Sequence, residues 1–194
     1  MTATMDDVLG RSLGADPALG RTRDGVVIAP PTFALRRIRA ERLDETHTPF
    51  LRRMHTDERV MATLGGGRTD AETKEYIDRG IAHWTEHGFG IWILRDRITD
   101  EPVGRAGLQH LTLEGMVEVE LCYALMPEFW NRGLATDAAR ACVTIGRDWL
   151  GLHSVVALTL PTNVASQRVL RKAALVRERD VRHAGLRHVV FRTD

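Results

Sequence analysis

The stretch "PEFWNRGLATDAA", Pro127–Ala139, decides the fold, because here a glycine-containing loop joins a strand to a helix. The residues just before it, "MVEVELCYAL" (Met116–Leu125), alternate between apolar and polar side chains for most of their length, as strands do. After the loop, one apolar stripe recurs at helical spacing: Leu134, Ala138, Ala141, Ile145 and Trp149. The pattern predicts strand, loop and helix in that order, with Gly133 and Ala135 at the mouth of the helix.

This loop is suited to hold an anion. The first N–H groups of a helix have no partner within the helix, and they carry the positive end of the helix dipole. Gly133 and Ala135 leave the backbone open to close approach, and Arg132 adds a positive charge. These features favour a phosphate or pyrophosphate, and the alternative is an ordinary tight turn, for which glycine alone suffices. The loop matches neither the phosphate-binding G-x-x-x-x-G-K-[ST] motif nor a dinucleotide-binding fingerprint.

Toward the N-terminus, the pattern predicts helices followed by a hairpin. The elements expected there are a strand at Thr32–Ala40, helices at Asp44–Thr56 and Asp57–Leu64, a helix from Asp70 to a stop at Gly88, and paired strands at Phe89–Arg95 and Val103–Leu111. Residues 1–31 are rich in Gly, Pro, Asp and Arg and show no period, so we expect an N-terminal extension, flexible or docked. Residues 32–194 form the expected domain.

Toward the C-terminus, a strand at Ser154–Leu160, a helix at Asn163–Leu175 and a last strand at His188–Arg192 are expected. A helix that connects the strand Met116–Leu125 to the next strand implies one parallel pair in the sheet. The predicted class is therefore α+β, a mixed α/β fold with a mostly antiparallel central sheet and flanking helices. Its one parallel pair lies at the loop, where ligands of such sheets prefer to bind.

Composition excludes several classes of protein. Lys and Arg number 27 and Asp and Glu number 26 in 194 residues, which argues against general binding to nucleic acid or to a membrane surface. No apolar run approaches the roughly 20 residues of a membrane span. The start "MTATMDDVLGRSLG" lacks the apolar core of a signal peptide, so we expect a cytoplasmic protein.

Few residues have the spacing of metal ligands. Cys122 and Cys142 do not form a metal-type pair, and packing within the strand is the expected role of Cys122, with a nucleophile as the alternative. His83 and His87 stand four residues apart on a predicted helix, where a metal could bridge them. The sequence pattern offers no third ligand, so we expect surface histidines and no metal.

Two motifs together resemble the GNAT acetyltransferases. "EVELCYALMPEFWNRGLATDAARACVTIG" (Glu118–Gly146) is followed by "LTLPTNVASQRVLRKAAL" (Leu158–Leu175), and this combination at this separation is specific. The sequence is similar to the branch that includes ribosomal-protein N-terminal acetyltransferases, from about Phe33 to Phe191. The resemblance implies the GNAT acyl-CoA N-acyltransferase fold. It also implies acetyl-CoA-dependent transfer of an acetyl group to a primary amine, of a small molecule or a protein N-terminus, by direct attack on the thioester.

The resemblance also implies which residues bind coenzyme A. The pyrophosphate falls on the backbone amides of Asn131, Arg132, Gly133, Leu134, Ala135 and Thr136. The strand before the loop splays in this family, so Tyr123, Ala124 and Leu125 offer backbone groups to the pantetheine arm. Asn163 matches an asparagine that contacts the same arm, and Ser166 matches a serine proposed to protonate the leaving thiolate.

The reaction also requires a base, because an amine is mostly protonated at neutral pH. Glu120 is the best candidate, on the same strand face as Glu118 and Cys122 and at the position of an acidic residue just before the splay in several relatives. A backbone N–H of the splayed strand would stabilise the oxyanion. Glu118 is the alternative base, and both glutamates could instead be solvent-facing strand residues.

Two departures from the family pattern leave other functions open. Leu170 stands where many members have a tyrosine that acts as general acid, and Ala174 and Leu175 replace the usual Gly-Phe pair. One alternative is a coenzyme A-binding domain that has lost catalysis and serves as a sensor or partner. Another is an acyltransferase that uses a longer acyl-CoA. The sequence identifies no particular acceptor, and we expect a monomer or homodimer.

Overall fold

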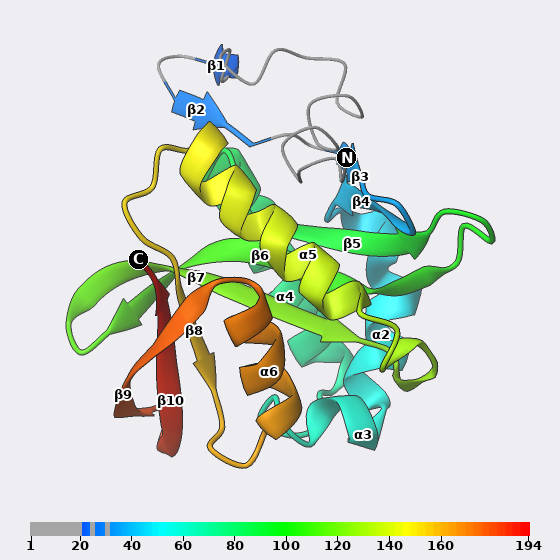
Figure 1. The fold of residues 1–194 in the computed structure, drawn as a ribbon. Coiled ribbons are helices and arrows are strands. Elements are labelled where there is room, and N and C mark those ends of the chain that lie inside the picture. The colour runs from blue at the N-terminus through cyan, green and yellow to red at the C-terminus, as the bar shows by residue number, and fades with distance from the viewer. Residues whose placement is uncertain (1–20, 24–25, 30–31) are drawn as a thin grey trace, which may run out of the picture.

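An eight-stranded sheet forms the centre of the molecule, with strand order β3-β4-β5-β6-β7-β8-β10-β9 (Figure 1). The computed structural model describes residues 21–23, 26–29 and 32–194. The strands of the large sheet are β3 (Thr32–Ala34), β4 (Ile38–Arg42), β5 (Ile91–Asp96), β6 (Pro102–Leu113), β7 (Met116–Leu125), β8 (Val156–Thr159), β9 (Leu175–His183) and β10 (Leu186–Thr193). Only β7 and β8 are parallel neighbours among these strands. The predicted class, an α+β fold with one parallel pair, is confirmed.

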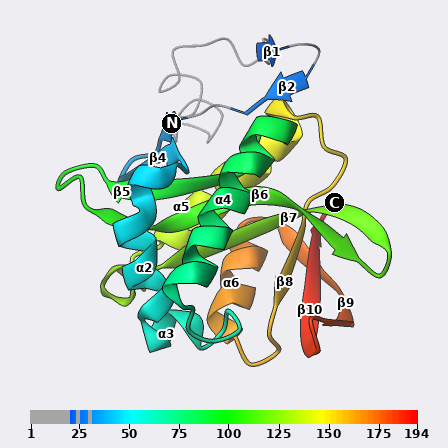
Figure 2. The ribbon, with the colours of Figure 1, turned by 180° about the vertical axis from the view of Figure 1, so that it is seen from behind.

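Helices cover both faces of this sheet. They are α2 (Thr48–Thr56), α3 (Glu58–Met61), α4 (Asp70–His87), α5 (Leu134–Thr144) and α6 (Val164–Lys172), with short turns η1 (Glu45–His47), η2 (Pro127–Phe129) and η3 (Ile145–Trp149). Helix α5 crosses one face (Figure 1), and α2 and α4 lie on the opposite face (Figure 2). Helix α6 packs beside α5, where the Arg140 guanidinium donates to the Lys172 carbonyl at 2.8 Å.

Local sequence explains the boundaries of α4. Thr69 caps its N-terminus in a capping box with Glu72, and the helix begins at Asp70, as predicted. Gly88 ends it in the left-handed conformation at φ 73°, which glycine adopts without strain. The helix buries Ile77 and Trp84 against the sheet, and the Trp84 indole donates to the Ile91 carbonyl at 2.8 Å.

The apolar stripe of α5 lies in the core, as its spacing predicts. Leu134, Ala138 and Ala141 of α5 and Ile145 of η3 are buried, and Trp149, the last residue of the predicted stripe, is half-buried in η3. The stripe packs toward β6 and β7. Burial of a large apolar side chain contributes about 1.5–3 kcal/mol, so this packing fixes the direction of α5 and hence the position of its first turn.

Two predictions about strands are wrong. The expected single strand Thr32–Ala40 is a tight hairpin of β3 and β4, in which the Leu35 amide donates to the Ile38 carbonyl at 2.7 Å. Apolar and polar side chains alternate with the same period in both strands, and the turn contains arginines instead of glycine or proline. The sequence pattern therefore does not indicate that one strand ends and another begins.

The expected helix Asn163–Leu175 ends at Lys172, and β9 follows it unpredicted. Ala174 makes the change of direction at φ 64°. Strand β9 carries charged side chains at the edge of the sheet, where charge discourages pairing with other chains. Charges on both faces also remove the alternation by which a strand is recognised.

Most of the predicted extension, residues 1–31, lies outside the described residues. Its described part contains a two-stranded hairpin, β1 (Arg21–Arg23) and β2 (Val26–Ile28). Ala29 is buried, and its amide donates to the Gly88 carbonyl at 2.8 Å. In the described ranges, no helix combines the length and the apolar character needed to cross a lipid bilayer.

Candidate functional site

A fork between β7 and β8 is the central feature of the site. The parallel register of these strands contains a single pair, Glu120 with Val156. Beyond Glu120, strand β7 continues to pair with β6, for example Tyr123 with Ala106, but has no β8 partner. The backbone groups of Tyr123, Ala124 and Leu125 on the β8 side are therefore free of this ladder, which suits the binding of an extended ligand as an added strand.

The N-terminus of α5 follows the open arm of the fork after a short connection that contains η2. Gly133 is its N-cap residue at φ 76°, and no side chain among the described residues caps the helix. Asn131 is also left-handed at φ 59°, and Asn131, Arg132 and Gly133 are exposed. The first-turn N–H groups of Leu134, Ala135 and Thr136 thus have no side-chain cap among the described residues, and helix N-termini of this kind favour anions.

Arg37 holds this loop in place, and sequence reasoning missed it. Its guanidinium donates to the carbonyl of Arg132 and, at 2.6 Å, to the carboxylate of Asp137. Asp137 is an acidic residue in the first turn of α5, so the ion pair offsets a charge that would repel an anion. No pattern signals this contact, because Arg37 lies in the unpredicted turn between β3 and β4.

Trp130 also connects the loop to β7. Its indole N–H donates to the carbonyl of Leu125 at 2.8 Å. One lone pair of the last β7 carbonyl is therefore engaged within the protein. This hydrogen bond links the loop to the end of the open arm of the fork.

Glu120 lies at the fork in an environment that raises the pKa of its carboxyl group. Burial is the largest cause, and a hydrogen bond from Gln109 and the charge of Arg105 oppose it. Gln109 lies directly opposite on β6, and its side-chain amide donates to Glu120 Oε2 at 3.0 Å. A carboxylate with a raised pKa is a better base near neutral pH.

Glu118 differs, although it shares the same strand face. Arg192 of β10 donates to both of its carboxylate oxygens, at 2.7 and 3.0 Å. These hydrogen bonds, only partly opposed by burial, lower the pKa of Glu118. A carboxylate held this way is a poor proton acceptor, so of the two candidates only Glu120 has the environment of a base.

Ser166 lies in the first turn of α6, where Asn163 positions it. The side-chain oxygen of Asn163 caps α6 by accepting from the Ser166 amide at 3.0 Å. The hydroxyl of Tyr123 lies 2.9 Å from the Ser166 hydroxyl, and it also contacts the Ser166 carbonyl at 3.1 Å. Burial raises the pKa of Tyr123 to about 12, so its hydroxyl remains protonated at neutral pH.

Cys122 lacks the properties of a nucleophile. Burial raises the pKa of its thiol to about 12, although the charge of Arg105 acts in the opposite direction. The thiolate is the reactive form of cysteine, and it is scarce at neutral pH for a thiol of this kind. Packing within the strand is therefore the better interpretation of Cys122.

The comparison with protein families identifies the class. Residues 34–176 match the model of the acetyltransferase (GNAT) domain. The chain therefore belongs to the GNAT acetyltransferase family. This match covers most of the fold described above, including the fork and the N-terminus of α5.

Among the individual proteins similar to the chain, two have names that agree with this class. YkkB of Bacillus subtilis, an uncharacterised protein, is 28% identical over 129 residues, which are 66% of this chain and 75% of YkkB. Two uncharacterised N-acetyltransferases of the same organism match over 49% and 35% of their own lengths.

Solved structures show the same fold. An acetyltransferase from Agrobacterium tumefaciens superimposes with a TM-score of 0.76 at 22% identity, over 89% of this chain and 99% of that one. A ribosomal L7/L12 α-N-protein acetyltransferase in complex with coenzyme A gives a TM-score of 0.69 at 16% identity, over 85% of this chain and 96% of that one.

Proposed function

We propose that the chain is an acetyl-CoA-dependent N-acetyltransferase that transfers an acetyl group to a primary amine. The observation that best supports this proposal is the fork at Glu120, which is followed along the chain by the uncapped N-terminus of α5. An extended thiol-bearing arm and a pyrophosphate need these two neighbouring features.

In this proposal, the backbone amides of residues 131–136 bind the pyrophosphate of coenzyme A. Arg132 contributes positive charge, and Gly133 allows close approach of the anion. The backbone groups of Tyr123, Ala124 and Leu125 bind the pantetheine arm. Asn163 lies beside this arm and orients the first turn of α6 through its cap.

Glu120 is the proposed general base and removes a proton from the acceptor amine. The amine nitrogen then attacks the thioester carbonyl carbon, and the carbon–sulfur bond breaks. A backbone N–H of β7 stabilises the oxyanion. Ser166 gives its proton to the departing thiolate, and the adjacent Tyr123 hydroxyl orients Ser166 and can restore that proton.

The acceptor is an amine of a small molecule or of a protein N-terminus. The named action of the L7/L12 α-N-protein acetyltransferase on a protein N-terminus supports the second type. The residues that bind the acceptor amine lie on the face of the sheet that α2 and α4 cover. The Glu120 side chain belongs to the same face.

A transfer screen tests this proposal. The full chain is mixed with acetyl-CoA and a panel of small amines and N-terminal peptides, and both free thiol and acetylated product are measured. Stoichiometric appearance of thiol and acetylated amine is the expected result. Tight binding of coenzyme A without turnover against any amine would favour a non-catalytic domain, and faster transfer from a longer acyl-CoA would favour a different acyl group.

A further inference from the structure

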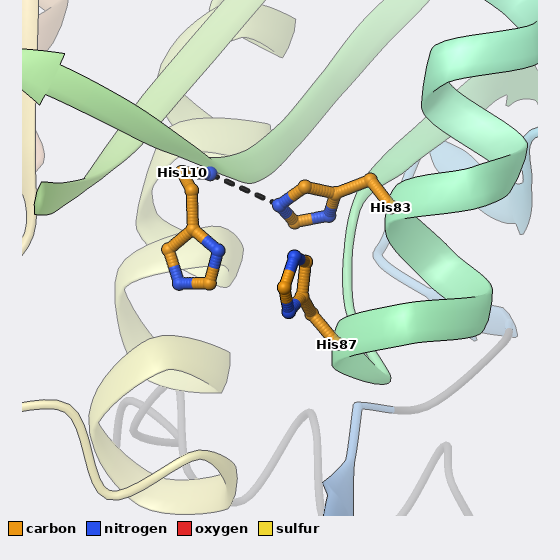
Figure 3. Close-up of side chains that lie close together, drawn as sticks. All are labelled: His83, His87 and His110. Atoms are coloured by element: carbon orange, nitrogen blue, oxygen red, sulfur yellow. Dashed lines mark hydrogen bonds between the residues drawn. The ribbon is translucent and has the colours of Figure 1, made fainter.

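Three histidines gather where the end of α4 meets the edge of β6 (Figure 3). His83 and His87 come from α4, and His110 of β6 is the third residue that the sequence pattern lacked. One ring nitrogen from each lies within 4.8 Å of the others. The ring centroids are 4.6 Å apart for His83 and His87 and 4.4 Å apart for His87 and His110.

The hydrogen bonds of His83 orient its ring as in a metal ligand. Nδ1 lies 2.8 Å from the carbonyl of Phe89, so it carries the proton and donates. Nε2 therefore carries the lone pair, which accepts a hydrogen bond from the backbone amide of His110 at 3.0 Å and would have to exchange that partner for an ion. Metal-binding histidines usually donate their other ring N–H to a carbonyl in this manner. Because His110 is exposed, water can replace His83 as the partner of its amide.

We propose that His83, His87 and His110 bind one divalent transition-metal ion, with Zn²⁺ as the best-suited ion. Imidazole nitrogens suit zinc, and three of them leave a fourth position for water. Zinc–nitrogen bonds of about 2.0–2.1 Å require ligand atoms no more than about 4 Å apart, so small side-chain rotations close the site. The carboxylate of Glu86, 3.7 Å from His87 Nε2, adds favourable charge. The ion would clamp α4 to β6 beside Gln109.

Metal titration of the full chain tests this site without reference to catalysis. Calorimetry with Zn²⁺ and visible absorption with Co²⁺ are expected to show one ion per chain. His87→Ala and His110→Ala are each expected to weaken binding at least tenfold. His188→Ala is the matched control, because His188 lies on the β9–β10 hairpin, where its ring contacts His183 at 6.1 Å between centroids and its Nδ1 lies 3.2 Å from the Leu186 carbonyl. Absence of a saturable site, or equal binding by His110→Ala, would overturn the proposal.

A separate observation concerns two buried polar atoms on the Glu120 face of the sheet. Among the described residues, Arg105 Nε and Tyr76 Oη are buried without a hydrogen-bond partner. Arg105 is 5% exposed, and its guanidinium lies 3.8 Å from Cys122 Sγ, on the strand face shared by Cys122 and Glu120. Arg105 and Arg68 both lie against the Tyr76 ring, with guanidinium carbons 5.0 and 4.9 Å from its centroid.

A buried cation without a carboxylate partner is costly. Neither Arg68 nor Arg105 forms an ion pair with an acidic residue in the part of the chain that the structure describes. We infer that the acceptor amine carries a carboxylate that binds this pair of arginines. The inference rests on the proposed transferase function. The planar fork of arginine matches a carboxylate, and such a contact would orient the amine toward Glu120.

Matched acceptors test this inference. An α-amino acid and its primary amide are compared in acetyl-CoA-dependent transfer, and the carboxylate form is expected to have at least tenfold higher kcat/KM. Arg105→Met is expected to remove this preference while retaining coenzyme A binding. Arg68→Met is expected to weaken the same preference, and it changes a residue that is less buried than Arg105. Equal kcat/KM for the two acceptors would overturn the inference and leave the transferase intact, whereas no transfer to any amine would overturn both.

Discussion

The hydroxyl of Tyr123 lies 2.9 Å from the hydroxyl of Ser166, although 43 positions separate the two residues. Tyr123 belongs to the open arm of the fork and Ser166 to the first turn of α6. The contact therefore joins the two walls between which the thioester would lie. It also brings a tyrosine hydroxyl to Ser166, the proposed acid, although Leu170 stands where many family members have a tyrosine.

Tyr123→Phe is expected to lower kcat about threefold to tenfold, the effect of one lost neutral hydrogen bond. The affinity for coenzyme A should stay within about twofold, because the backbone of Tyr123 is unchanged. Steady-state kinetics and calorimetry measure the two quantities. Ser166→Ala is the companion variant. Turnover by Ser166→Ala at the parent rate would show that neither Ser166 nor Tyr123 acts through this hydroxyl pair as the general acid.

Gly133→Asp is expected to abolish coenzyme A binding, because it places a carboxylate at the proposed pyrophosphate site. The backbone of Gly133 is left-handed, at φ 76°, so any residue with a side chain at this position is strained by about 1–2 kcal/mol. A Cβ at Gly133 would lie 3.2 Å from the Arg37 guanidinium. Gly133→Ala has the same strain without the charge and serves as the control in calorimetry. Unchanged affinity in the aspartate variant would contradict the assignment of the loop.

Glu120→Gln is expected to stabilise the fold at pH 8. The pKa of Glu120 is raised by burial, so the native state favours the protonated carboxyl group. Between the ordinary pKa, about 4.3, and the higher native value, the unfolded chain loses this proton first. Stability therefore falls as pH rises through that window. The amide avoids this loss, so thermal unfolding should show a higher Tm for the variant at pH 8 and no gain at pH 4.

Glu118→Gln provides the opposite control for stability. Its native pKa is lowered by Arg192, so the ionised form stabilises the native state above the ordinary pKa. The substitution removes a charged partner of Arg192 and should lower Tm at pH 8. A rise in Tm for both variants would show that the two carboxylates do not differ as described.

His55 is expected to make the fold sensitive to mild acid. Burial, with the charges of Arg68 and Arg105, lowers the pKa of His55 to about 3. An unfolded histidine takes up its proton near pH 6.5, so stability should fall as pH drops below that value, by up to about 1.4 kcal/mol per pH unit. Urea unfolding at several pH values between 7 and 5 measures the slope. His55→Gln should lower the slope of the unfolding free energy against pH by the equivalent of about one proton. An identical slope in the two proteins would contradict this account.

The parts of the site that depend on local pattern could be predicted from the sequence. Helical spacing and Gly133 located the start of α5, and strand alternation put Glu118 and Glu120 on one face. These signals are local, because a helix or strand repeats within a few residues. The predicted parallel pair also followed from local elements, since only a crossover helix separates β7 from β8.

The contacts that distinguish the site residues could not be predicted in this way. Arg37 reaches Arg132 across 95 positions, and Gln109 reaches Glu120 only because the β6–β7 register places them opposite each other. The third histidine, His110, joins His83 and His87 through the same tertiary packing. Such pairings depend on the register and twist of the sheet, which no short window of sequence contains.

Acetyl transfer by Glu120→Gln across the pH range is the most direct test of the proposed function and its base. With an accepted amine and acetyl-CoA, the unsubstituted chain should show kcat/KM that rises with pH through the Glu120 carboxyl pKa. The variant should bind coenzyme A normally, turn over about 10²–10⁴-fold more slowly, and lose this acidic limb except for the part due to the amine itself. Glu118→Gln should remain near the parent rate. Parent-level turnover by Glu120→Gln at every pH would contradict the account.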